Sequence, residues 1–205
     1  LLDMFLLREK LPVNLILRLI GYGFLFLGIF FIAKIYWPVA RAEIIYKTLS
    51  PTSTKKEIVA IDPNFSIVIP KININTKVVK NVDPFDSKKY QLALTQGVAH
   101  AEGSALPGFP GNIFIFAHSA SNWYQANQYN AIFYLINKLD PSDQIDLYYQ
   151  GSKYSYHVLE KKIVSSSDIN YLSNSLNTNT LTLMTCWPPG TTLKRLIVVA
   201  TPFQK

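Results

Sequence analysis

The amino-terminal part of the chain carries one long apolar stretch, from Leu15 to Trp37. No charged residue falls between Leu19 and Ala33 inside it. A helix rises about 1.5 Å per residue, so the stretch would be about 34 Å long, enough to cross a hydrocarbon core of about 30 Å. Two aromatic residues close it, as at a membrane interface, and Pro38 predicts the end of the helix. The pattern predicts a transmembrane helix over residues 15–37.

Basic residues around this stretch predict its orientation. Arg8, Lys10 and Arg18 lie at its amino-terminal end and favour a cytoplasmic tail over residues 1–14. Basic residues beyond the other end reduce this asymmetry. The prediction is a single-pass protein of the cell membrane whose remaining chain is extracytoplasmic.

Two other interpretations of the stretch stay open. A signal peptide is cleaved after a short apolar core and a small-residue site, and Ala40-Arg41-Ala42 has the A-x-A form. A helix buried in a protein core is the second alternative, although a surface that is apolar on all sides suits lipid better. We favour a retained anchor because the stretch is longer than the usual core of a signal peptide.

The rest of the chain predicts a stalk followed by an all-β domain. Residues 38–60 mix charged residues with serine, threonine and proline without sustained periodicity, as in a linker. Over residues 61–205, short β-rich segments recur between turn signals. About eight short strands with few helices favour a closed or nearly closed barrel. The clearest segments are 65–69, 72–75 with 76–79 as its continuation, 112–116, 144–149, 154–158, 180–184 and 196–200.

Helical signals in this domain are sparse. Residues 130–139 carry apolar residues at roughly helical spacing and are followed by Pro141. They predict a short helix that covers one side of the β core.

Composition and charge narrow the classes of function. The chain is 49% hydrophobic and 16% charged, which excludes a disordered or fibrous protein. Its net charge of +7 comes from dispersed residues without a basic stripe, so we expect no nucleic-acid partner. One cysteine excludes an intramolecular disulfide framework and a cysteine-based zinc site. We expect no metal and no cofactor.

The single cysteine, Cys186, follows a predicted strand and precedes a Pro-Pro-Gly turn, which is a more exposed position than a strand interior. A thiolate is a nucleophile, and it needs a base or a cation nearby. His118 also follows a predicted strand, and Arg195 begins the strand after the turn, where a hairpin would return it to the thiol. Imidazole can transfer protons, and guanidinium can hold an oxyanion or a carbonyl. Each residue also has an ordinary explanation, as a packed cysteine, a capping histidine or a surface arginine.

Five segments in order match one family pattern. Thr182-Leu183-Met184-Thr185-Cys186, followed by Arg195, has the form TLxTC…R. With the other four segments, which cover most of residues 61–205, it resembles the sortases, cysteine transpeptidases of bacterial envelopes. The other segments are 67–72 (I-x-I-P-K-I), 94–112 (the glycine-rich run before the catalytic histidine), 133–145 (the helix and G-D-x-I strand) and 154–168 (Y-x-Y-x-V…V-x-x-x-D).

The resemblance implies a sortase-like eight-stranded β-barrel with short helices over residues 61–205, after the transmembrane helix. By position, Cys186 corresponds to the nucleophile and His118 to the general acid and base. Arg195 corresponds to the group that stabilises the oxyanion or the substrate, and Thr185 to a threonine that contacts the substrate. The implied reaction cleaves a Leu-Pro-x-Thr-Gly-like sorting signal of a secreted protein and joins it to an amine, of a cell-wall precursor or a pilin lysine. Calcium, used by some members, is not expected, because no clear carboxylate cluster is present.

Three residues depart from the family pattern. Ala117 stands where glycine commonly precedes the catalytic histidine, Ser142 replaces the glycine of G-D, and the bulky Trp187 follows the cysteine. These departures bear on substrate specificity more than on mechanism. The remaining histidines, His100 and His157, are expected to be structural.

Two other classes of function stay open. One is another extracytoplasmic Cys-His peptidase or transpeptidase, although the compact Ser-His-Gly-Cys arrangement of L,D-transpeptidases is not found in the sequence. The other is a non-catalytic β-barrel binding module on a membrane tether.

Overall fold

Eight strands close into a barrel in the order β1-β2-β3-β4-β7-β8-β6-β5. The computed structural model describes residues 12–48, 58–119, 132–172 and 179–203. The chain divides into two compact units, Leu1–Trp37 and Pro38–Lys205, and the barrel belongs to the second. The predicted all-β, eight-stranded barrel with short helices is therefore confirmed. Its elements are β1 (Phe65–Ile69), η1 (Pro70–Ile72), β2 (Ile74–Val82), α2 (Ser87–Leu94), β3 (Val98–Ala101), β4 (Gly111–Phe116), η2 (Ile132–Lys138), β5 (Gln144–Tyr149), β6 (Ser152–Ser165), η3 (Asn170–Leu172), β7 (Asn179–Trp187) and β8 (Lys194–Pro202).

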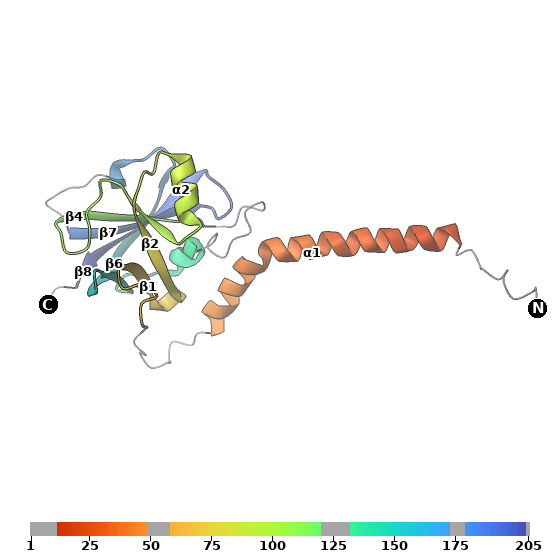
Figure 1. The fold of residues 1–205 in the computed structure, drawn as a ribbon, viewed down its shortest axis with the longest axis horizontal. Coiled ribbons are helices and arrows are strands. Elements are labelled where there is room, and N and C mark those ends of the chain that lie inside the picture. Colours follow the sequence, from red (N-terminus) through yellow and green to blue (C-terminus); the bar gives the residue numbers. More distant parts are fainter. Residues whose placement is uncertain (1–11, 49–57, 120–131, 173–178, 204–205) are drawn as a thin grey trace, which may run out of the picture. The chain divides into compact units, whose positions relative to one another are not determined.

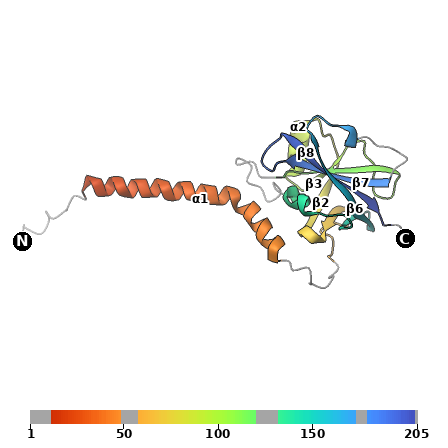
Figure 2. The same ribbon diagram turned by 180° about the vertical axis from the view of Figure 1, so that it is seen from behind.

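Two neighbouring strand pairs are parallel, β2 with β3 and β4 with β7, and the other neighbours are antiparallel. Figure 1 shows α2 lying against the barrel beside β2, and Figure 2 shows the reverse side with β6, β7 and β8. All six residues of β4 are buried. A strand covered on both faces reads as a continuous apolar run, which explains why residues 112–116 alternate so little.

The first helix, α1 (Val13–Thr48), is longer than predicted and continues past Pro38. A proline inside a helix removes one hydrogen bond and costs about 3 kcal/mol. The residues that follow include good helix formers such as Ala40, Arg41 and Glu43, which favour resuming the helix. The prediction that Pro38 ends the helix is therefore wrong, and the segment up to Thr48 is helical.

Within α1, the portion Val13–Lys34 is long and apolar enough to cross a membrane, and 0% of it is buried. Its large apolar side chains, among them Leu25 and Phe26, are exposed around the helix. An exposed apolar surface of this length matches the thickness of a bilayer core. This helix is the candidate for the predicted membrane span.

The predicted helix over 130–139 is a 3-10 helix, η2, and residues 130 and 131 lie outside the described residues. Phe133, Ile136 and Leu139 are each 0% exposed. Phe133 lies at a kink inside η2 and Leu139 follows its last residue, so these side chains reach the core from a short, irregular helix. The prediction of a short helix against the β core is thus correct in place and wrong in helix type.

The observed strand bounds match the predicted ones at some strands and not at others. β1 and β5 match the predicted residues, whereas β2 begins only at Ile74 because η1 takes up the residues before it. β6 runs on to Ser165 through mostly exposed and charged residues that pair with β8. β3 and α2 were not predicted.

Ser142, which replaces a family glycine, has a φ of 76° in the left-handed region. In this region the Cβ of a residue other than glycine destabilises the folded state by about 1–2 kcal/mol. Glycine avoids this strain but loses more backbone entropy on folding, which costs about 0.5–1 kcal/mol. We expect Ser142→Gly to raise the free energy of unfolding by about 0.5–1 kcal/mol, measured by urea denaturation. Ser152→Gly, at the exposed start of β6, is the matched control and should lower it. Equal effects of both changes would contradict this account.

Candidate active site

Two strand ladders bring the candidate catalytic residues to one end of the barrel. β4 and β7 run parallel, with Phe116 opposite Met184. The Ala117 amide donates to the Met184 carbonyl at 3.2 Å, so the pairing continues beyond β4. His118 and Cys186 each follow two positions after that register pair. Because parallel strands end on the same side of a sheet, both side chains leave the barrel at the same edge.

The second ladder is antiparallel and pairs β7 with β8. Its register places Arg195 directly opposite Cys186, which confirms the predicted return of the hairpin. The Arg195 Nη1 donates to the carbonyls of Thr192 and Lys194, both at 3.1 Å. The guanidinium thus braces the loop between the two strands beside the thiol.

His118 is held through its backbone and has a half-buried ring. Its carbonyl oxygen accepts a hydrogen bond from the Phe133 amide at 3.2 Å, which ties it to η2. Burial lowers the pKa of His118 below its ordinary value of 6.5. The imidazole is therefore neutral at pH 7 and able to accept a proton.

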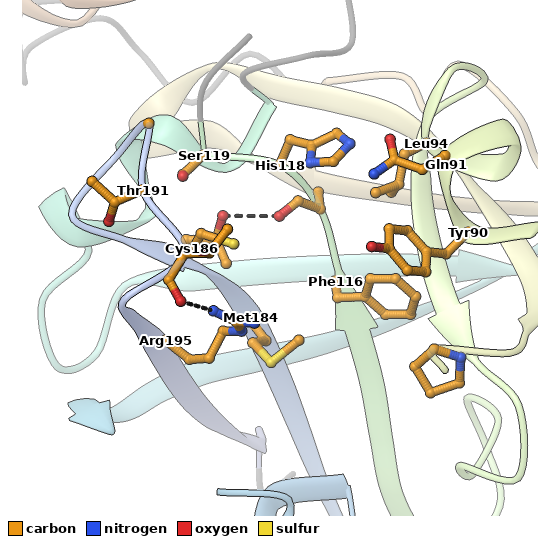
Figure 3. A pocket seen from close by; sticks show the side chains of 15 residues that line it. Tyr90, Gln91, Leu94, Phe116, His118, Ser119, Met184, Cys186, Thr191 and Arg195 are labelled. Atoms are coloured by element: carbon orange, nitrogen blue, oxygen red, sulfur yellow. Dashed lines mark hydrogen bonds between the residues drawn. The ribbon is translucent and has the colours of Figure 1, made fainter. Parts of the chain in front are cut away.

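Cys186, His118 and Arg195 all line one pocket, with a cavity volume of about 260 Å³. Figure 3 shows the three side chains around it, with the side chains of α2 along the opposite rim. Cys186 is partly exposed. The α2 residues Tyr90, Gln91 and Leu94 were not singled out from the sequence. The side chain of Asp86 caps α2 by accepting hydrogen bonds from the amides of Lys88 and Lys89. An aspartate at this position favours the start of a helix, so the sequence does contain an indication of α2.

Thr185 also lines the pocket but is only 3% exposed. Its Oγ1 donates to the Ala117 carbonyl at 2.8 Å, a bond drawn in Figure 3. This bond joins the residue before Cys186 to the residue before His118. In this structure the Thr185 hydroxyl therefore fixes the spacing of the two chain segments.

We expect Thr185→Val to lower the free energy of unfolding by about 1–3 kcal/mol. The change leaves the buried Ala117 carbonyl without its donor. Thr185→Ser keeps a hydroxyl and should lose less, so the pair isolates the hydrogen bond in urea denaturation. A valine variant as stable as the serine variant would show that the bond contributes nothing.

The other two histidines do not line the pocket. His100 is fully buried, with Nε2 at 2.8 Å from the Ala105 carbonyl, so this nitrogen carries the proton. Burial lowers the pKa of His100. His157 Nε2 lies 3.1 Å from the Thr201 hydroxyl on the β6–β8 ladder. Over the described parts of the chain, no group of three or more histidine, cysteine or acidic side chains is arranged to hold a metal ion.

Known proteins are similar to this chain in sequence and in structure. Sortase D of Bacillus subtilis is 27% identical over 133 residues, which are 63% of this chain and 59% of that protein. The chain thus spans less than two thirds of the length of this relative. A Clostridium perfringens Sortase D5 transpeptidase is similar in structure, with a TM-score of 0.57 and 25% identity over 84% of this chain and 99% of that chain.

A second Clostridium perfringens structure, of sortase C with the C-terminal cell wall sorting motif, shares the fold. Its TM-score is 0.57, with 24% identity over 84% of this chain and 89% of that chain. The family model for the sortase domain matches residues 67–203, which include all eight strands except the first two residues of β1. That match covers Cys186, His118 and Arg195, and the chain belongs to the sortase family.

Proposed function

We propose that this protein is a membrane-anchored cysteine transpeptidase that cleaves a sorting signal and joins the released acyl group to an amine. The observation that carries the proposal is the convergence of Cys186, His118 and Arg195 on one pocket by two separate ladders. A nucleophile, a neutral imidazole and a guanidinium can together carry out acyl transfer through a thioester, as nucleophile, proton carrier and oxyanion donor.

In the first half of the proposed reaction, His118 takes the proton of the Cys186 thiol. The thiolate attacks the carbonyl carbon of the scissile peptide bond and forms a carbon–sulfur bond. The bond to the leaving nitrogen then breaks, and the His118 imidazolium gives its proton to that amine. A thioester on Cys186 remains, and the carboxy-terminal fragment leaves.

In the second half, an acceptor amine attacks the thioester carbonyl. His118 takes a proton from the incoming nitrogen, a new amide bond forms, and the carbon–sulfur bond breaks. The His118 imidazolium then gives its proton to the Cys186 thiolate, which restores the thiol and the neutral imidazole. Arg195 would stabilise the oxyanion in both halves. Its Nη1 bonds to Thr192 and Lys194 hold it at the pocket rim before substrate binds.

The substrate we propose is a Leu-Pro-x-Thr-Gly-like sorting signal of a secreted protein, cut between threonine and glycine. Family membership supports this substrate class, and so does the structural likeness to a sortase C solved with its C-terminal cell wall sorting motif. The acceptor would be an amine of a cell-wall precursor or a pilin lysine. A role for Thr185 in contacting the substrate belongs to the same proposal, because Thr185 lines the pocket.

The proposed location is the cell membrane, with the barrel on the extracytoplasmic side. Its support is the unburied apolar helix Val13–Lys34 and the basic residues that precede it. The full chain should fractionate with membranes and resist alkaline extraction. External protease should digest the barrel in cells stripped of their wall, and a protected barrel would contradict the orientation.

The proposed reaction is tested with the full chain in detergent and a peptide that contains Leu-Pro-x-Thr-Gly. Intact-mass spectrometry after acid quench should find the acyl fragment on Cys186, and added triglycine should yield the ligated peptide. Peptides with the motif scrambled are the control. Release of the fragment without an enzyme adduct, or equal turnover of the scrambled peptide, would refute the proposal.

A further inference from the structure

On the α2 side of the pocket, one side-chain carbonyl has no hydrogen-bond partner in the part of the chain that the structure describes. Gln91 lines the pocket, and its Oε1 atom is buried without a partner among the described residues. Buried polar atoms are nearly always paired, so an unpaired one needs an explanation. In Figure 3 the Gln91 amide and the His118 ring point toward one another.

The position of Gln91 is well fixed. α2 is capped at its start by Asp86, whose side chain accepts from two backbone amides of the first turn. The ring of the preceding residue, Tyr90, packs edge-on against the ring of Phe116 in β4, with 6.4 Å between the ring centroids. Leu94, three residues beyond Gln91, is buried, with 3% of its surface exposed. The cap and these contacts therefore fix α2, and with it the backbone of Gln91, beside the end of β4.

His118 needs a hydrogen-bond acceptor for its second ring nitrogen during the reaction, and among the described side chains that line the pocket Gln91 offers an unpaired, buried one. When the ring is protonated, both nitrogens donate: one faces the reacting groups and the other requires an oxygen. The other ionisable side chains that line the pocket are Tyr90 on α2, Cys186 on β7 and Arg195 on β8. None is a carboxylate, and the pKa of His118 is lowered by burial. A carboxamide orients the histidine in a known Cys-His-Asn arrangement.

We infer that Gln91 is a positioning residue whose Oε1 accepts a hydrogen bond from the outer ring nitrogen of His118 when that ring carries its second proton. The inference rests on the proposed function, because it assigns an orienting partner to the proposed acid and base. Over the described residues, no hydrogen bond joins the two groups in the neutral enzyme. Rotation of the ring or the amide makes the bond as the imidazolium forms, so the stabilisation is present only while His118 is charged.

Two substitutions test this assignment in steady-state peptide transfer by the full chain. Gln91→Met keeps the length of the side chain and removes the acceptor. We expect kcat to fall about 10-fold to 100-fold with KM within about threefold, since the lost bond exists only in the charged state. The melting temperature should be unchanged or higher, because an unpaired buried carbonyl has been removed. Gln96→Met, at an exposed residue after α2, is the matched control and should change neither quantity.

Gln91→Glu provides the second readout. A carboxylate beside the ring favours its charged form, so the acid limb of kcat/KM should move to higher pH than in the parent enzyme. A Gln91→Met enzyme with kcat within about twofold of the parent, or a Gln91→Glu enzyme with an unmoved acid limb, would overturn the inference. Loss of kcat that is matched by loss of melting temperature would overturn it too, since a structural role alone predicts that pairing.

These outcomes are separable from a failure of the proposed function. If the parent enzyme forms the Cys186 thioester and Gln91→Met turns over normally, only the inference is wrong. If the parent forms no thioester at all, the proposed function is wrong first.

Discussion

Replacing Cys186 with alanine should abolish peptide transfer, with kcat/KM lower by at least about four orders of magnitude. Loss of a nucleophile that acts as a unit with its base costs as much as about a million-fold in a comparable triad, so the measured loss is expected to reach the limit of the assay. The readout is cleavage of a fluorogenic Leu-Pro-x-Thr-Gly peptide together with intact mass for the acyl-enzyme.

The alanine variant should remain folded. Cys186 lies at the partly exposed end of β7, so its truncation leaves the core intact. Unchanged far-ultraviolet circular dichroism and melting temperature would verify this. A folded Cys186→Ala variant that still transfers peptide at the parent rate would exclude the thioester route.

Replacing His118 with alanine should lower kcat/KM by about 10²-fold to 10⁴-fold, the usual contribution of a positioned acid–base group. His157→Ala is the matched control, because His157 lies on β6 away from the pocket and should keep the parent rate. Initial rates with the same peptide and acceptor amine measure both.

The pH profile gives an independent check on His118. The ring must be neutral to take the thiol proton, and burial lowers its pKa below 6.5. The acid limb of the rate should therefore lie below that of an ordinary histidine, with a fall of about tenfold per pH unit below the lowered pKa. An acid limb above pH 7 that disappears in His118→Ala would contradict the sign of this shift.

Much of the barrel follows from the sequence because its strands carry a strong local signal. Alternation predicts β5 residue by residue, and Pro70 marks the end of β1. The proximity of Cys186 and Arg195 can also be predicted from the sequence, because the two residues flank one hairpin turn. By contrast, the proximity of His118 and Cys186 depends on a parallel pairing of strands that no short pattern encodes.

The features that sequence reasoning missed are short or tertiary in origin. α2 has only eight residues, and its outward-facing Leu92 is 65% exposed, which blurs the apolar periodicity. β3 has four residues, too few for alternation to stand out. α1 continues beyond Pro38 because the residues after the proline favour a helix. The prediction gave more weight to the proline, which usually ends a helix, than to those residues. Gln91 is distinguished by a side-chain carbonyl that is buried without a hydrogen-bond partner among the described residues. This property arises from packing, so the sequence does not reveal it.

The hydrogen bond from Thr185 to Ala117 joins residues 68 positions apart. Contacts of such separation form late, because the chain between them must first be ordered. The thiol consequently has no base beside it while the barrel is still open. Pairing of β4 with β7 is therefore the folding step that brings Cys186 and His118 to one pocket. Under the proposed function, we expect acylation of Cys186 by a sorting peptide to begin during refolding only after this pairing, so that its onset reports closure of the barrel.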